Sequence, residues 1–191
     1  MIKKYDNLAL LIHPMYSIVT DIYRNTTGMG KITFKEMESE YVKRLNVYKE
    51  SISSFKNTNT LFVLVEPTKD LMNFKLEFFY KHMMEDLYVF AKKELGLSFR
   101  KITDLNYLSD IKKITPTLKK NIGVFSFGEH REVCVKTFNE YTINFLKENN
   151  FKPISKGIQI KFSFDIENKR LRQVQKEKPK PKPKKIIKKR R

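Results

Sequence analysis

Four apolar runs along the chain have the pattern of buried β-strands. Residues 8–12 (LALLI), 61–65 (LFVLV) and 122–127 (IGVFSF) are almost continuously apolar, and a weaker run covers 97–102. Such runs are typical of parallel strands that are covered on both faces. Residues 158–164 (IQIKFSF) instead alternate between apolar and polar, which predicts a half-exposed strand at an edge of the sheet.

The segments between these runs carry apolar residues at helical spacing. Over residues 34–55 an apolar side chain recurs every three or four positions, and Thr33 and Glu36 have the spacing of a capping box. Similar spacing predicts three further helices, at 74–95, 104–120 and 134–149. Pro116 predicts that the second of these divides into two short helices.

Strands and helices therefore alternate along residues 1–168. This order predicts one three-layer, doubly wound α/β domain with a mostly parallel sheet and helices on both faces. In such sheets the binding crevice lies beyond the carboxyl ends of the strands. Residues that directly follow a predicted strand are accordingly the first candidates for a functional site.

Charge separates the end of the chain from this domain. The formal net charge is +18, and residues 169–191 contribute +12 of it through 13 Lys/Arg and one Glu. The segment also contains Lys-Pro repeats and few apolar residues, so we expect a disordered basic tail.

Dense positive charge of this kind favours binding to phosphate backbones by counterion release. We therefore expect the tail to bind RNA or a ribonucleoprotein, with anionic lipid or a purely solubilising role as alternatives. The tail lacks aromatic residues, which argues against base stacking. The basic residues assigned to nucleic-acid binding are Lys178, Lys180, Lys182, Lys184, Lys185, Lys188, Lys189, Arg190 and Arg191.

The chain has one cysteine and no apolar run of the roughly 20 residues that a membrane span needs. A single cysteine cannot form an internal disulfide, and the short apolar run near the N-terminus lacks a cleavage site. We therefore expect a cytoplasmic protein with no membrane partner. The sequence leaves open whether it forms a homo-oligomer.

The single cysteine, Cys134, directly precedes a predicted helix and follows a predicted strand. Unpaired amides and the helix dipole at such a position favour the thiolate, which is the reactive form. The same amides can stabilise the oxyanion of acyl chemistry. The alternative is that Cys134 is a small buried apolar residue without reactivity.

The segment "GEHREVCVKTFNEY" (128–141) resembles the isochorismatase-like cysteine hydrolases, which include nicotinamidases and isochorismatases. In that family a buried strand ends in glycine, a short turn follows, and Cys-Val opens a helix. The segment "LALLIHPMYS" (8–17) looks like the family's first strand, which leads into Asp-Met-Gln. The resemblance implies Cys134 as nucleophile and Lys101 as the active-site lysine.

The chain departs from the family at the third member of the catalytic triad. Aligning Met15 with the family's methionine puts Pro14 where the family has its aspartate, and proline cannot accept a proton. His13 or Asp21 could replace that base. The family's metal-binding histidines are also missing after the second strand, so we expect no metal and no cofactor.

Two hypotheses follow. The first is a divergent, catalytically silent member of the family that binds RNA or a ribonucleoprotein through its tail, with the α/β domain as scaffold. The alternative is an active cysteine-dependent hydrolase of the amidase type, acting on a small molecule through Cys134, Lys101 and either His13 or Asp21.

Overall fold

The structure is a computed structural model in which four segments of the chain are described. They cover residues 3–20, 33–68, 74–129 and 134–158. All of them belong to one compact unit, Met1–Lys161. The basic residues 169–191 lie outside the described part, so the expectation of a disordered tail is not addressed.

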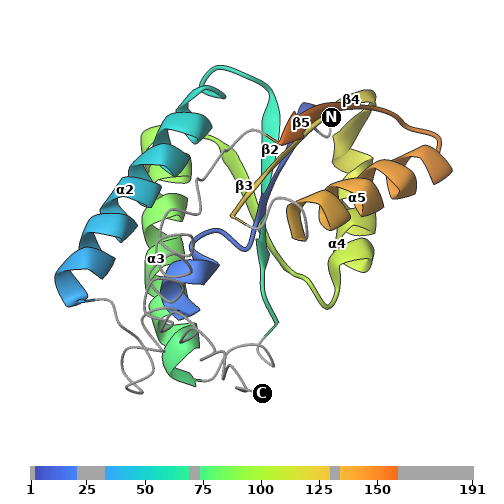
Figure 1. Ribbon diagram of the computed structural model, residues 1–191. Coiled ribbons are helices and arrows are strands. Elements are labelled where there is room, and N and C mark those ends of the chain that lie inside the picture. The colour runs from blue at the N-terminus through green and yellow to red at the C-terminus, as the bar shows by residue number, and fades with distance from the viewer. Residues whose placement is uncertain (1–2, 21–32, 69–73, 130–133, 159–191) are drawn as a thin grey trace, which may run out of the picture. The chain divides into compact units, whose positions relative to one another are not determined.

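Five strands form a wholly parallel sheet in the order β3–β2–β1–β4–β5 (Figure 1). The strands are β1 (Tyr5–Ile12), β2 (Thr60–Glu66), β3 (Ser98–Thr103), β4 (Leu118–Gly128) and β5 (Lys152–Ile158). The central strand β1 pairs with β2 on one side and with β4 on the other. Its last five residues are buried, as its continuous apolar run predicted.

Helices cover both faces of this sheet, which confirms the three-layer α/β architecture. The helices are α2 (Phe34–Ser53), α3 (Phe74–Val89, continued by a π-helical turn at Phe90–Glu94), α4 (Tyr107–Ile114) and α5 (Lys136–Glu148). Figure 1 shows α2 and α3 on one side of the sheet and α4 and α5 on the other. The predicted capping box is present, because the Glu36 amide donates to Thr33 Oγ1 at 3.2 Å and the Thr33 amide donates to Glu36 Oε2 at 2.8 Å. None of the described helices is long and apolar enough to cross a membrane.

The last strand begins six residues earlier than the sequence pattern indicated. β5 covers Lys152–Ile158, whereas the alternating pattern placed a strand at 158–164, of which 159–164 lie outside the described part. The sequence does not indicate this strand, because Pro153 and Gly157 are poor strand residues. In the structure its Ile154 is 55% exposed. Among the described residues β5 pairs with β4 alone. A proline is tolerated in such an edge strand, because its missing N–H then interrupts no ladder between two strands.

The strand register brings the carboxyl ends of four strands into one row. Ile12 pairs with both Val65 and Gly128, and Val65 pairs in turn with Ile102. The strand order reverses between β1 and β4, since β2 and β3 lie on one side of β1 and β4 and β5 on the other. Ligand sites of open α/β sheets form outside this reversal point. The residues that follow this row therefore define where a site can form.

Gly128, the last residue of β4, lies too close to its neighbours to carry a side chain. A Cβ atom there would lie 2.5 Å from the carbonyl oxygen of Ile12 and 2.6 Å from Cγ2 of Val135. The Ile12 oxygen belongs to the backbone of the central strand, and Val135 is fully buried. The glycine thus allows Val135, which follows Cys134 and precedes α5, to approach the edge of the sheet.

We expect Gly128→Ala to lower the free energy of unfolding by about 1–3 kcal/mol, because the added methyl group overpacks a site with no room. Urea denaturation followed by circular dichroism measures the change. The matched control is Gly96→Ala, where no atom lies within 4 Å of the added Cβ and only the φ of +65° opposes alanine. The steric argument fails if Gly128→Ala costs no more than Gly96→Ala.

Candidate active site

The backbone directly after β1 adopts two strained conformations. His13 has φ 44° and Met15 has φ 65°, both in the left-handed region that non-glycine residues avoid. Each such residue costs about 1–3 kcal/mol, and the surrounding structure must enforce it. Here the His13 amide donates to the Val65 carbonyl at 3.0 Å, and Met15 is fully buried. The strain keeps His13 at the carboxyl edge of the sheet instead of letting the chain continue as a strand.

His13 faces a carboxylate from the other side of β2. Its Nε2 atom lies 3.5 Å from Oδ2 of Asp104, and the two side chains are 8% and 14% exposed. Asp104 follows β3, and its amide donates to the Glu66 carbonyl at 3.0 Å, which fixes the turn. A buried imidazole next to a carboxylate can accept a proton, because the carboxylate stabilises the imidazolium that forms.

Cys134 lies in the turn that leads into α5 and is half-buried. Burial raises the pKa of its thiol, and the negative charge of Asp104 raises it further, while the amide of Cys134 itself lowers it. The expectation that the helix N-terminus would favour the thiolate is therefore wrong for the resting protein. Desolvation and a neighbouring carboxylate together outweigh the amide, so the resting group is the thiol and its reactions need a base.

Two aromatic residues enclose these groups. The Tyr16 ring lies 6.2 Å from the His13 ring, and burial together with the charges of Cys134 and Asp104 raises the pKa of the Tyr16 phenol. The Phe138 ring, from α5, packs edge-on against His13 with 5.6 Å between ring centres. Asp104 thus pairs with His13, and its charge acts on both Tyr16 and Cys134. We call these four residues the rim cluster.

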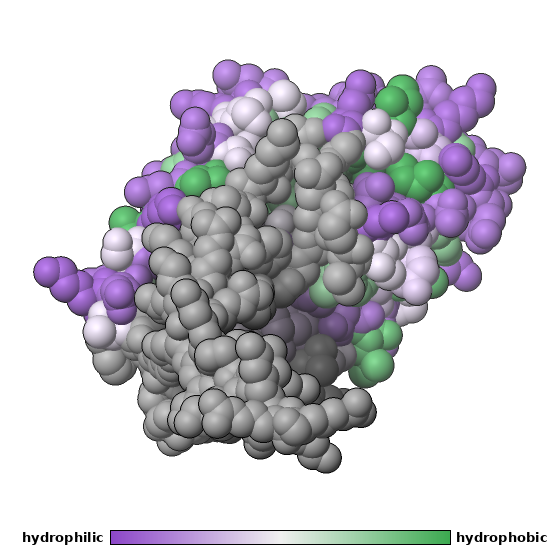
Figure 2. Space-filling model, in the orientation of Figure 1, coloured by the Kyte–Doolittle hydropathy of each residue, from purple (hydrophilic) through white to green (hydrophobic). Residues whose placement is uncertain are grey.

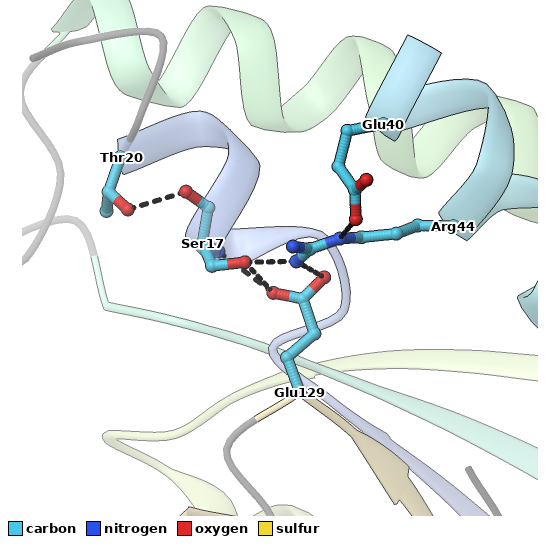
Figure 3. Close-up of polar contacts among 5 residues, drawn as sticks. All are labelled: Ser17, Thr20, Glu40, Arg44 and Glu129. Carbon is cyan, nitrogen blue, oxygen red and sulfur yellow. Dashed lines mark hydrogen bonds and ion pairs between the residues drawn. The ribbon is translucent and has the colours of Figure 1, made fainter. Parts of the chain in front are cut away.

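A buried ion pair holds the turn after β4 in place (Figure 3). Glu129 is 2% exposed, and its Oε1 lies 3.0 Å from Nη1 of Arg44 in α2. Its Oε2 accepts hydrogen bonds from the amide and the hydroxyl of Ser17, at 3.0 and 2.5 Å. Arg44 also donates to Ser17 Oγ and, at 2.8 Å, to Glu40. Burial alone would lower the pKa of Arg44, but Glu129 and Glu40 hold it above its usual value.

Three carboxylates lie at the carboxyl ends of three strands of the sheet. Glu66 ends β2, Asp104 follows β3 and Glu129 follows β4. All three act on the buried phenol of Tyr80, whose pKa is raised first by burial and then by their charges. Two of them are partly compensated, because Arg44 pairs with Glu129 and the charge of Lys101 lowers the pKa of Glu66.

A pocket of about 340 Å³ adjoins the rim cluster. Residues 104–109 form one wall, and Phe138 and Tyr141 of α5 form the other. Phe138 belongs to both features, because its ring also packs on Tyr107 with 4.6 Å between ring centres. A volume of this size suits a small molecule, for which sites typically measure about 300–1,000 Å³.

The structure separates the residues that the sequence assigned to catalysis. Cys134 and His13 are linked through Asp104, which lies 3.5 Å from His13 and whose charge acts on Cys134. Lys101 instead lies exposed on β3, with its ammonium 5.1 Å from the centre of the Tyr88 ring, and its charge acts on Glu66. Asp21 and the nine basic residues of the tail lie outside the described part.

Sequence reasoning missed Asp104 and Tyr16. Asp104 stands two residues after the predicted strand 97–102, which is the position where a parallel sheet presents functional side chains. This position after a strand is a signal that the sequence contains, whereas the family pattern places the carboxylate after the first strand. Nothing in the sequence pattern distinguishes Tyr16 from the many aromatic residues of the core.

No protein-family model, curated protein or solved structure matches this chain. In the described part of the chain, no three His, Cys, Asp or Glu side chains are grouped so as to hold a metal ion. The chemistry of the site is therefore argued from the rim cluster itself.

We expect the rate at which the Cys134 thiol reacts with iodoacetamide to rise with a midpoint above about pH 8.5, the ordinary pKa of an exposed cysteine. Asp104→Asn removes one of the two causes, so the midpoint should fall by roughly half a pH unit to one unit. The rate of alkylation against pH measures both. Asp110→Asn, which neutralises a carboxylate paired with Lys113 on α4, is the control and should change nothing. A midpoint that stays the same in Asp104→Asn would separate Asp104 from the thiol.

Proposed function

We propose that the chain is a cysteine-dependent hydrolase of small molecules and a divergent relative of the isochorismatase-like enzymes. One observation carries the proposal: at the carboxyl edge of a parallel sheet, Asp104 lies 3.5 Å from the His13 imidazole, its charge acts on the Cys134 thiol, and it lines a pocket. A nucleophile with an adjacent base that a third group orients is the general pattern of covalent catalysis. The left-handed backbone of His13 also supports the proposal, because strain of this kind clusters at functional sites.

The reaction requires the proton of Cys134 to leave as its sulfur attacks. In the proposed first step the sulfur bonds to the carbonyl carbon of an ester or amide, and His13 takes the thiol proton while Asp104 stabilises the imidazolium. The bond to the leaving group then breaks, and the proton passes from His13 to that group. Water hydrolyses the resulting thioester, with His13 again as base, and this returns the thiol.

The proposed base differs from the one that the family pattern implies. Pro14 occupies the aspartate position after the first strand, and Asp104 supplies a carboxylate from the end of β3 instead. Lys101 has no part in the proposed step, because its contacts lie with Tyr88 and Glu66. The single cysteine also fits a reducing compartment, so we place the enzyme in the cytoplasm.

A panel of p-nitrophenyl esters tests the proposal. We expect an acyl-protein adduct on Cys134, detected as a mass increase of the intact chain, and turnover that Cys134→Ala abolishes. His13→Asn should slow turnover by about 10²-fold, the usual contribution of a general base. Asparagine is chosen because it tolerates the left-handed backbone at this position.

The control is His82→Asn, which removes an exposed histidine of α3 and should leave turnover unchanged. The proposal is wrong if Cys134→Ala turns over the esters as fast as the parent chain. It is also wrong if the two histidine variants are equally affected, since the rate would then not depend on the rim cluster.

We further propose that the basic segment 169–191 attaches the enzyme to RNA or a ribonucleoprotein. The supporting observation is its charge of +12 in 23 residues, which exceeds that of the rest of the chain. Binding of this kind neutralises phosphates without reading sequence, and it weakens steeply as salt rises. This proposal is independent of catalysis, because none of the rim residues belongs to the segment.

Charge-matched variants of the full chain test the tail. One variant carries four Lys→Gln changes in the tail, at Lys182, Lys184, Lys188 and Lys189, and the other carries four on the domain, at Lys35, Lys43, Lys93 and Lys112. Fluorescence anisotropy with single-stranded RNA should show about tenfold weaker binding at low salt and a salt slope reduced by up to about 3 for the tail variant. Equal losses in both variants would mean that the tail has no special role.

A further inference from the structure

The pocket beside the rim cluster combines apolar walls with one formal charge. Of the residues that line it, Asp104 is the one that carries a charge at neutral pH. Tyr107, Phe138 and Tyr141 supply aromatic surface, with Phe138 edge-on to Tyr141 at 6.4 Å between ring centres. A ligand in this pocket would therefore meet aromatic rings and a carboxylate together.

Three large hydrophobic side chains at the mouth of the pocket are exposed to solvent. Leu105, Leu108 and Tyr141 are 75%, 46% and 52% exposed, and all three line the pocket. Figure 2 shows hydrophobic surface on the visible face as separate spots, several of them on the side of α4 and α5. A small apolar body placed in the pocket would cover part of this surface, which is a favourable contribution to binding.

The carboxylate of Asp104 is only partly compensated by the protein. Its Oδ2 faces His13 at 3.5 Å, whereas its buried Oδ1 has no hydrogen-bond donor among the described residues. Buried carboxylate oxygens normally accept hydrogen bonds, so the described part of the protein leaves the Asp104 charge without a donor at this atom. A ligand in the pocket would meet the charge of Asp104 rather than bond to the buried Oδ1.

We propose that the pocket selects substrates that carry a positive charge on a compact aromatic or apolar body, such as esters and amides of arylalkylammonium compounds. The aromatic walls bind the apolar body and also attract the cation through their ring faces. Asp104 favours the ammonium group and repels an anion of the same shape. This inference rests on the proposed function, because it names the substrate class of that same site.

The experiment measures binding separately from catalysis, in the full chain with Cys134→Ala. Isothermal titration calorimetry compares three probes of similar shape: phenethylammonium, 2-phenylethanol and phenylacetate. We expect phenethylammonium to bind roughly tenfold more tightly than 2-phenylethanol, and phenylacetate to bind most weakly. Asp104→Asn should remove the preference for the cation, and Asp110→Asn, on the same side of the molecule but outside the pocket, should keep it.

The order of the three probes is also measured in the parent chain, so the test does not depend on how well Asp104→Asn folds. The inference is overturned if the neutral or the anionic probe binds as tightly as the cation, or if Asp104→Asn keeps the full preference. Turnover of neutral esters at Cys134 without any charge preference among the probes would leave the proposed function standing and remove this inference. A charge preference among the probes without any turnover would overturn the proposed function and leave the charge selectivity of the pocket standing.

Discussion

The buried carboxylate of Glu129 joins the parts of the molecule on which the rim cluster depends. It follows β4 directly, and it binds Ser17 of the turn after β1 and Arg44 of α2. These contacts tie together the two strands between which the sheet order reverses. Losing one partner of a buried ion pair costs roughly 3–5 kcal/mol, because the other charge remains buried without compensation. The ion pair therefore stabilises one fixed arrangement of the ends of β1 and β4.

This arrangement also explains how strain can persist beside the site. His13 and Met15 both occupy left-handed backbone conformations, and the ion pair lies just beyond them in the chain at Ser17. Strained residues of this kind persist only where the surrounding structure enforces them. The fully buried Met15 and the hydrogen bond from His13 to Val65 provide that enforcement on the inner side. The imidazole is thereby held between Asp104 and Phe138 rather than free to turn toward solvent.

Charge is distributed in opposite senses over the chain. The segment 169–191 is strongly positive, whereas the carboxyl edge of the sheet gathers Glu66, Asp104 and Glu129. Of these, Asp104 raises the pKa of the Cys134 and Tyr16 side chains, after burial has already raised both. A basic chain thus carries a carboxylate at its candidate site. The two proposed activities, attachment to a polyanion and selection of a cation, use separate surfaces and need not compete.

The sequence by itself determined the layers of the fold and the position of the thiol within them. Continuous apolar runs at 8–12, 61–65 and 122–127 indicate strands buried on both faces, and periodic helices between them leave a parallel sheet as the simple arrangement. The run of 128–141 placed Cys134 after a strand and before a helix, where the structure has it. Local pattern suffices here because burial on two faces and helical periodicity are properties of neighbouring residues.

Only the tertiary structure decided what surrounds the sulfur. The charge of Asp104 acts on Cys134 from the end of a strand three places away from β4 in the sheet, and no local pattern encodes which strands become neighbours. The same holds for β5, whose polar sequence becomes a strand solely through pairing with β4. It holds also for the ionisation of the thiol, since a helix terminus favours the thiolate but burial and a distant carboxylate reverse that preference. Strand order and desolvation are set by the whole chain, and they determine the chemistry at its one cysteine.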